Sequence, residues 1–131
     1  MEFKHLLPEE RQIWATFLER TPMKFSELKY DVHLGKGLTP PPDAPEWLKA
    51  QIAATSRKRC DVVAETEDAI WIFEVTPRAG MAAFGKILNY MRLYREEYAP
   101  SKPLRGAVVC WRVEPDVAEI YKEHGIEIFV V

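Results

Sequence analysis

The chain has 131 residues, of which 47% are hydrophobic, which is enough to build one core without disulfide or metal support. Its formal net charge of −2 excludes a surface designed throughout to hold a phosphate backbone, although a local basic strip is compatible with it. No apolar stretch is long enough for a signal-peptide core or a bilayer span, so we expect a cytoplasmic protein that is not secreted and does not enter a membrane.

The first elements in chain order are a helix and a strand. Pro8 followed by two glutamates is a favourable helix opening, and this helix is predicted to end near Thr21. Its apolar stripe consists of Ile13, Trp14, Phe17 and Leu18. Residues 25–34 then alternate with period two, which predicts a half-buried strand. Its apolar side is Leu28, Tyr30, Val32 and Leu34, and its polar side is Glu27, Lys29, Asp31 and His33.

A proline-rich loop follows at residues 35–46. Four prolines and two glycines in this segment prevent a regular helix or a central strand, so it is predicted to be a loop or a projecting arm. A short helix is expected from Glu46 to Ala54. Trp47 at its start fits either ordinary packing or an anchor for a partner, since tryptophan is enriched at binding hot spots.

The central segment is predicted to be a β-hairpin. Its strands are Arg59–Ala64 and Ala69–Val75, both rich in sheet-forming side chains, and residues 65–68 form the turn. Cys60 lies in the first of these apolar runs and Cys110 in a later one, a placement typical of reduced core thiols.

The C-terminal half is predicted to alternate helices and strands. The expected order is helix 81–97, strand 104–113, helix 115–124 and strand 126–131. The long helix should bury Phe84, Ile87, Leu88, Met91 and Tyr94. A helix that joins two strands of one sheet makes them parallel, so the last two strands should run side by side in the same direction.

Two carboxylates in the predicted hairpin are the main candidates for a functional site. Asp61 and Glu74 lie on the two otherwise apolar strands of the hairpin and should face each other. Burying two negative charges in this way is costly unless a cation or hydrogen bonds neutralise them, and carboxylate oxygens suit Mg²⁺.

With twelve residues between Asp61 and Glu74, and with an amphipathic helix after them, the order of elements resembles the PD-(D/E)xK nuclease-like superfamily. The resemblance covers nearly the whole chain and implies one restriction-endonuclease-like domain over residues 1–131. Its fold class would be α/β (α+β), a mixed sheet in which an antiparallel meander is followed by a βαβ crossover. It also implies that Asp61 and Glu74 bind Mg²⁺. Two positions depart from the pattern: Thr76 stands where a lysine is expected, and Cys60 replaces the usual proline.

The resemblance also implies where a substitute cation and a third carboxylate would be found. In this superfamily the lysine can move to the following helix, which makes Lys86 the candidate, while Arg78 is closer in sequence. The alternative is that Lys86 is an ordinary solvated lysine. A third carboxylate from the first helix would be Glu9, Glu10 or Glu19, and the sequence does not choose among them.

Basic residues near the carboxylates are candidates for contact with nucleic acid or with a partner. Arg57, Lys58 and Arg59 precede the site, and Lys86, Arg92 and Arg95 follow one helix, so these side chains would form a modest phosphate-binding strip if they converge. Such residues are more often merely solvated. We interpret His33 as a surface residue, because no second histidine is spaced with it as a zinc pair would require.

Three functions are consistent with these residues. The missing lysine favours, by a small margin, a non-catalytic module that binds protein partners in an assembly. The segment from Cys60 to Leu88 resembles small proteins of tailed phages, which implies a structural place in a phage particle. The second reading is an active Mg²⁺-dependent DNA or RNA endonuclease with Lys86 or Arg78 in place of the lysine. The third is an ordinary domain in which the two carboxylates diverge and bind no metal.

Overall fold

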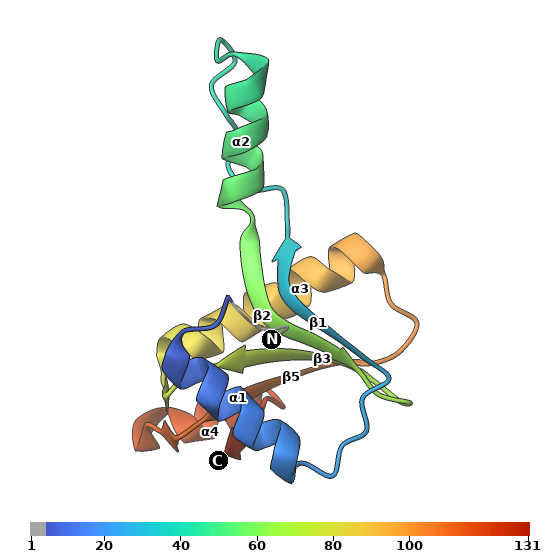
Figure 1. The fold of residues 1–131 in the computed structure, drawn as a ribbon, viewed down its shortest axis with the longest axis vertical. Coiled ribbons are helices and arrows are strands. Elements are labelled where there is room, and N and C mark those ends of the chain that lie inside the picture. The colour runs from blue at the N-terminus through green and yellow to red at the C-terminus, as the bar shows by residue number, and fades with distance from the viewer. Residues whose placement is uncertain (1–4) are drawn as a thin grey trace.

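The structure, a computed structural model, describes residues 5–131 and consists of one main sheet with helices on both faces (Figure 1). The helices are α1 (Pro8–Arg20), α2 (Glu46–Ser56), α3 (Met81–Tyr98) and α4 (Pro115–Glu123). The strands are β1 (Glu27–Leu34), β2 (Lys58–Glu65), β3 (Ile70–Val75), β4 (Arg78–Ala79), β5 (Leu104–Cys110), β6 (Arg112–Val113) and β7 (Glu127–Val130). Among the described residues, no helix is both long and apolar enough to cross a membrane.

The main sheet is mixed and has the strand order β1-β2-β3-β5-β7. Strands β1, β2 and β3 form an antiparallel meander, whereas β3, β5 and β7 run parallel. Helices α3 and α4 are the crossover connections that parallel neighbours require. The predicted fold class is therefore confirmed, including the parallel pairing of the last two long strands.

Alternation along the buried strands divides the core between the two faces of the sheet. Strand β3 is buried along its whole length, with Phe73 packed against α1 and Ile72 on the opposite face, beneath α3. Trp14 and Phe17 of α1 contact Phe73, with ring centroids at 5.2 and 5.5 Å. On the other face, Ile87 and Tyr121 join α3 and α4 into a second cluster. The sheet between these layers places the ends of its central strands near the helix termini.

The predicted side-chain alternation of β1 is wrong in its second half. Leu28 and Tyr30 pack on the α1 side, whereas Val32 and Leu34 pack on the α3 side, although all four have the same parity. Between them, Asp31 has a left-handed backbone conformation with φ of 54°, and this turn of the backbone exchanges the two faces of the strand.

Strand β2 changes faces at the matching position. Cys60 packs on the α3 side and Val62 on the α1 side, although they too have the same parity. Tyr30 pairs with Val62 and Val32 with Cys60, so Asp31 and Asp61 lie opposite each other at the point where both strands turn. This local distortion lies beside one of the two candidate metal ligands.

The expected strand 104–113 is split at Trp111. The backbone N–H groups of Trp111 and Arg112 both donate to the carbonyl oxygen of Pro77 at 3.1 Å, which draws the chain out of the main sheet. The last two residues of the expected strand, Arg112 and Val113, form β6, which pairs in parallel with β4. This two-stranded sheet was not predicted, because strands of two residues give no periodic signal in the sequence.

Residues 35–57, which we call the arm, project away from the sheet (Figure 1). The arm contains the predicted proline-rich loop and α2, and none of its described side chains is buried. Its base is held by Arg57, whose guanidinium donates to the carbonyl oxygens of Gly35 and His33 and pairs with Glu97. The arm is therefore attached by polar contacts at its base and does not extend the core.

Candidate active site

The two carboxylates predicted from the sequence meet at one end of the hairpin. Val62 pairs with Phe73 in the antiparallel ladder, so the next positions in the same register are Asp61 and Glu74. One oxygen of Asp61 accepts a hydrogen bond from the backbone N–H of Val75 at 2.9 Å, which holds the Asp61 side chain against β3. The two carboxylates therefore converge, in contrast to the reading in which they diverge.

The environment of this pair disfavours two negative charges. Burial and the nearby charge of Asp61 raise the pKa of Glu74 to about 9. Burial also raises the pKa of Asp61, although the N–H of Val75 acts in the opposite direction. The Glu74 side chain is only 8% exposed, and its Oε1 is buried without a hydrogen-bond partner. Burial and mutual repulsion therefore disfavour the doubly ionised form of the pair.

Lys86 supplies part of that charge. Its ammonium Nζ lies 3.5 Å from Oε2 of Glu74, and it also lowers the pKa of that carboxyl. Thr76, at the usual lysine position, uses its hydroxyl to donate to the carbonyl oxygen of Arg78. The guanidinium of Arg78 is paired with Glu114 at 3.4 Å. Of the two cations proposed from the sequence, Lys86 is therefore the one that contacts the carboxylate pair.

The first helix directs one of its three candidate carboxylates to the same place. Glu9 and Glu19 are exposed, whereas Glu10 is partly buried and its charge interacts with those of Asp61 and Lys86. Burial raises the pKa of Glu10, and the N–H of Leu7, which donates to its Oε1 at 3.0 Å, partly offsets this. Pro8 at the helix start and this backbone contact fix the first turn of α1 over the hairpin.

The donor set fits a hard divalent cation. Carboxylate oxygens are the ligands that Mg²⁺ prefers, and the unpartnered Oε1 of Glu74 is a free acceptor between buried groups. Within residues 5–131, no three His, Cys, Asp or Glu side chains are close enough to form a complete metal cluster. Mg²⁺ commonly binds through one or two carboxylates and keeps several waters or substrate oxygens, so a site with two protein carboxylates is compatible with it.

Most of the other predicted contact residues are already engaged within the protein. Arg57 lies at the base of the arm, and Arg59 pairs with Asp31 across the strands. Arg92 pairs with Glu96 on its own helix, while Lys58 is exposed. Trp47 is 68% exposed on the arm. Arg57, Arg59 and Arg92 thus each have an acidic partner within the protein, and a contact of these residues with nucleic acid or a partner stays a prediction.

His33 is partly exposed, with its Nε2 3.8 Å from Asp31. His5, by contrast, was missed by the sequence analysis, because a single histidine before the first helix carries no spacing signal. Its charge interacts with those of Glu10 and Asp61, so it belongs to the surroundings of the site.

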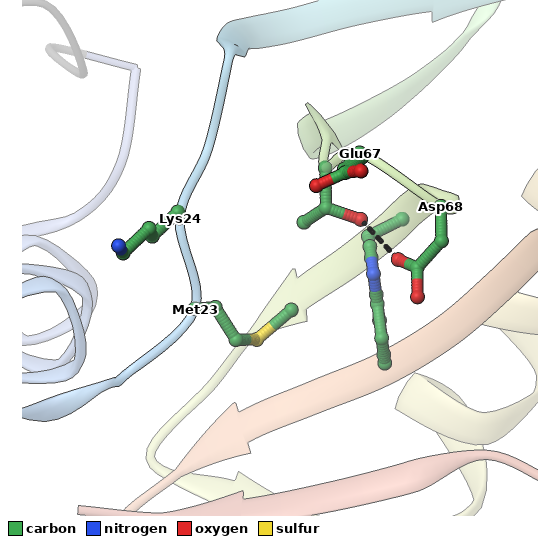
Figure 2. A pocket seen from close by; sticks show the side chains of 6 residues that line it. Met23, Lys24, Glu67 and Asp68 are labelled. Atoms are coloured by element: carbon green, nitrogen blue, oxygen red, sulfur yellow. Dashed lines mark hydrogen bonds between the residues drawn. The ribbon is translucent and has the colours of Figure 1, made fainter.

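A surface pocket of about 640 Å³ lies at the opposite end of the hairpin (Figure 2). Its lining residues are Met23, Lys24, Thr66, Glu67, Asp68 and Trp71. The Thr66 hydroxyl donates to Asp68 at 3.0 Å, and Met23 and Lys24 lie across from that turn. Its polar side chains are hydrogen-bonded or solvated, and neither Asp61 nor Glu74 lines this pocket.

Comparison with known proteins shows a likeness of fold. No protein-family model matches the chain, and no curated protein sequence matches it. Among solved structures, "Structure of EndoMS-dsDNA2 complex" matches with a TM-score of 0.55 and 17% identity, over 96% of this chain and 46% of that one. "Structure of EndoMS in apo form" matches with a TM-score of 0.53 and 12% identity, over 93% and 45%.

A repair endonuclease from Pyrococcus abyssi also matches, over 56% of this chain and 32% of that one, with 21% identity and a TM-score of 0.49. The chain spans about half the length of the two EndoMS structures. At these identities the comparison shows a shared fold, and the residues of this chain must carry the functional argument.

Proposed function

We propose that this chain, which has the restriction-endonuclease-like PD-(D/E)xK fold, is a Mg²⁺-dependent nuclease module that hydrolyses phosphodiester bonds. DNA is the first substrate to test, because one structure with this fold is a complex with double-stranded DNA. The sequence alone gave a slight preference to a non-catalytic module because a lysine was missing at Thr76. The contact of Lys86 with Glu74 supports the active nuclease instead.

The observation that carries the proposal is the 3.5 Å contact between Lys86 Nζ and Glu74. Hydrolysis needs a cation that orients the attacking water and stabilises the charge that develops on phosphate oxygens. Lys86 reaches the carboxylate pair from the helix that follows it, and its side chain is 55% exposed. The ammonium is thus in contact with the buried pair and also accessible to a substrate.

Asp61 and Glu74 would hold the metal, and Oε1 of Glu74 is buried without a hydrogen-bond partner of its own. When bound, Mg²⁺ would act as a Lewis acid on the phosphate and lower the pKa of a bound water. The N–H of Val75 fixes Asp61 in orientation, and Glu10 adds negative charge from α1. Lys86 would donate a hydrogen bond to the attacking water or to a phosphate oxygen as the P–O bond breaks.

The test is cleavage of duplex and single-stranded DNA in Mg²⁺ by Lys86→Met. We expect kcat to fall about 100- to 1,000-fold, as when one charged donor is removed from a reaction centre, and Lys86→Arg to retain part of the activity. The matched control is Arg92→Met on the same helix, whose partner is the exposed Glu96. Equal activity in wild type and Lys86→Met would reject the role of Lys86.

A second candidate function is a protein-binding module, and the arm favours it. Trp47 and Leu38 are each 68% exposed on a segment without buried described side chains. An isolated helix of 11 residues is marginal in water, so a partner that covers it would stabilise it. An assembly such as the phage particle suggested by the sequence would be one setting for such a contact.

Light scattering combined with gel filtration tests this second function. If the arm binds a second copy or another protein, the wild type should elute as an oligomer or co-purify with a partner. Trp47→Ser together with Leu38→Ser should then give a folded monomer that no longer co-purifies with a partner. A wild-type protein that is monomeric and alone, and that cleaves DNA, would leave only the nuclease function.

A further inference from the structure

A hollow of about 240 Å³ lies between the base of the arm and α3. Three cationic side chains line it, Lys36 from the arm, Lys58 from the start of β2 and Arg92 from α3. Asn89 of α3 also lines it, and no aspartate or glutamate among the described residues does. The hollow therefore gathers positive charge from three separate segments of the chain.

The two lysines of this hollow are not neutralised within the protein. None of the ion pairs within residues 5–131 includes Lys36 or Lys58. Both side chains are exposed, so a ligand from solution can reach them. An ammonium group has three donors and no acceptor, so the ligand that suits this pair is an anion with several acceptor oxygens.

The acidic residues nearest to the hollow are already paired with arginines. Glu96 pairs with Arg92 at 3.0 Å, and Glu97 pairs with Arg57 at 3.1 Å. Both glutamates line an adjacent hollow, on whose border Lys36 lies. Because Arg92 is engaged in this way, the positive charge left for a ligand is that of the two lysines.

The backbone at the base of the arm holds the two lysines beside each other (Figure 1). The N–H of Leu38 donates to the hydroxyl of Ser56, two residues before Lys58. Gly37 has a left-handed conformation with φ of 77°, and a Cβ there would lie 2.5 Å from that hydroxyl. Only glycine allows this close approach, so the position of Lys36 next to the start of β2 is built into the loop.

The hollow is connected to the carboxylate site along two elements. Lys58 precedes Asp61 by three residues of β2, which corresponds to about 10 Å of strand. Asn89 lies three residues after Lys86, so it is on the same side of α3, about one turn further along. The phosphates of a nucleic-acid strand follow one another at about 3.4 Å along the helix axis, so about 10 Å corresponds to about three nucleotides.

We propose that Lys36 and Lys58 bind one backbone phosphate of the nucleic acid, about three nucleotides from the phosphodiester held at Asp61 and Glu74. This inference rests on the proposed nuclease function and adds a second contact point for its substrate. The contact reads no base, because an ammonium on a phosphate carries no sequence information. Its role is to align the strand along β2 and α3 and to increase affinity.

Binding of a fluorescent DNA duplex to Lys36→Gln together with Lys58→Gln tests this proposal. Fluorescence anisotropy is measured in EDTA, so that Mg²⁺-dependent cleavage does not interfere. We expect the affinity to fall about 10-fold at about 0.1 M salt, and the slope of log K against log salt to decrease by about 1, as for the loss of one phosphate contact. The melting temperature should match that of wild type, because neither lysine has a partner within the described residues.

The matched control is Lys24→Gln together with Lys122→Gln, which removes the same charge elsewhere. Lys24 lines the pocket at the turn end of the hairpin, and Lys122 is 68% exposed on α4. This control should retain the wild-type salt slope. An equal loss of affinity in both double variants would show that only net charge matters and would overturn the proposal, as would a wild type that binds neither duplex nor single-stranded DNA.

A second measurement separates a backbone phosphate from a free one. Inorganic phosphate is titrated into wild type and into the Lys36, Lys58 double variant by calorimetry. If the double variant loses affinity for inorganic phosphate and binds DNA as the wild type does, the hollow is a site for free phosphate and the proposal is overturned.

The outcomes also separate this inference from the nuclease function. If the wild type cleaves DNA and the double variant retains both its affinity and its KM, the nuclease function stands and this inference fails. If the double variant loses affinity and salt slope as expected but the wild type does not cleave, the phosphate site stands and the nuclease function fails. In an active enzyme, KM should rise while kcat at saturating DNA stays within about twofold, since neither lysine contacts the reacting atoms.

Discussion

The two ends of the β2–β3 hairpin both carry acidic side chains, yet they differ in how those charges are satisfied. At the turn, Glu65 pairs with Lys102 at 2.6 Å, and Asp68 accepts a hydrogen bond from Thr66. At the other end, Asp61 and Glu74 are mostly buried and share one partly exposed cation, Lys86. The carboxylates Glu65 and Asp68 at the turn end therefore have partners, whereas the carboxylates at the opposite end need further positive charge to ionise together.

The surface pocket and the candidate reactive side chains of this molecule therefore lie at different ends of the hairpin. The pocket of about 640 Å³ lies at the turn end, and none of its lining side chains has a buried polar atom without a partner. The carboxylate pair has raised pKa values and an unpartnered oxygen, which are features typical of functional sites. Substitutions at the carboxylate end of the hairpin should therefore have larger effects than matched substitutions at the turn end.

The largest effect is expected on metal binding. Glu74→Gln removes one of the two carboxylates that would hold a divalent cation, so its affinity for Mn²⁺, used as a calorimetric probe for Mg²⁺, should fall about 100-fold or more. Glu65→Gln at the turn end should bind Mn²⁺ as the wild type does. Equal affinities in all three proteins would show that the cation binds elsewhere or only nonspecifically.

The next effect is on stability as a function of pH without metal. The pKa of Glu74 is raised from 4.5 to about 9, so between these pH values the folded state holds a proton that the unfolded state has lost. The free energy of unfolding should therefore decrease as pH rises through this window, by up to about 1.4 kcal/mol per pH unit.

Glu74→Gln is neutral at every pH and should lack this slope, so in EDTA it should be more stable than wild type at pH 8 and similar to it at pH 4. Urea denaturation at a series of pH values measures the difference. Glu65→Gln, the control at the turn end, should retain the wild-type slope. Parallel pH profiles for wild type and Glu74→Gln would mean that Glu74 is ionised and well solvated in the folded protein.

A smaller effect is expected at the edge of the site. Glu10 faces Asp61 from α1 but lies outside the carboxylate pair itself, so Glu10→Gln should lower cleavage about 10-fold and leave the chain folded. The neighbouring Glu9 is exposed, and Glu9→Gln should be indistinguishable from wild type. If the two variants behave alike, Glu10 has no part in the reaction.

The sequence was sufficient to predict the four helices, the five strands of the main sheet, and the meeting of Asp61 with Glu74. Periodicity located α1, α3 and the hairpin because each buries a regular apolar face, and antiparallel pairing then brings the two carboxylates together. Lys86 could be named as a candidate from its position on α3, but its contact with Glu74 depends on how that helix packs on the sheet.

The remaining features depend on tertiary structure. The exchange of strand faces at Asp31 follows from one left-handed residue that has no distinctive sequence signal, so period two was extended too far along β1. The choice of Glu10 among three glutamates depends on the angle at which α1 crosses the hairpin. His5 precedes every predicted element, and its interaction with the charges of Glu10 and Asp61 depends on how the chain before α1 lies in the fold.

Cleavage of duplex DNA in the presence of Mg²⁺, compared between wild type and Asp61→Asn, tests the central claim most directly. Asn keeps the size of the side chain and removes its charge, so folding should be preserved, which the melting temperature verifies. We expect Mg²⁺-dependent cleavage by the wild type, inhibition by EDTA, and loss of activity in Asp61→Asn by at least about 100-fold. Cleavage that persists in Asp61→Asn would show that the carboxylate pair is not the catalytic centre, and a wild type inactive on duplex and single-stranded DNA and on RNA would contradict the nuclease function.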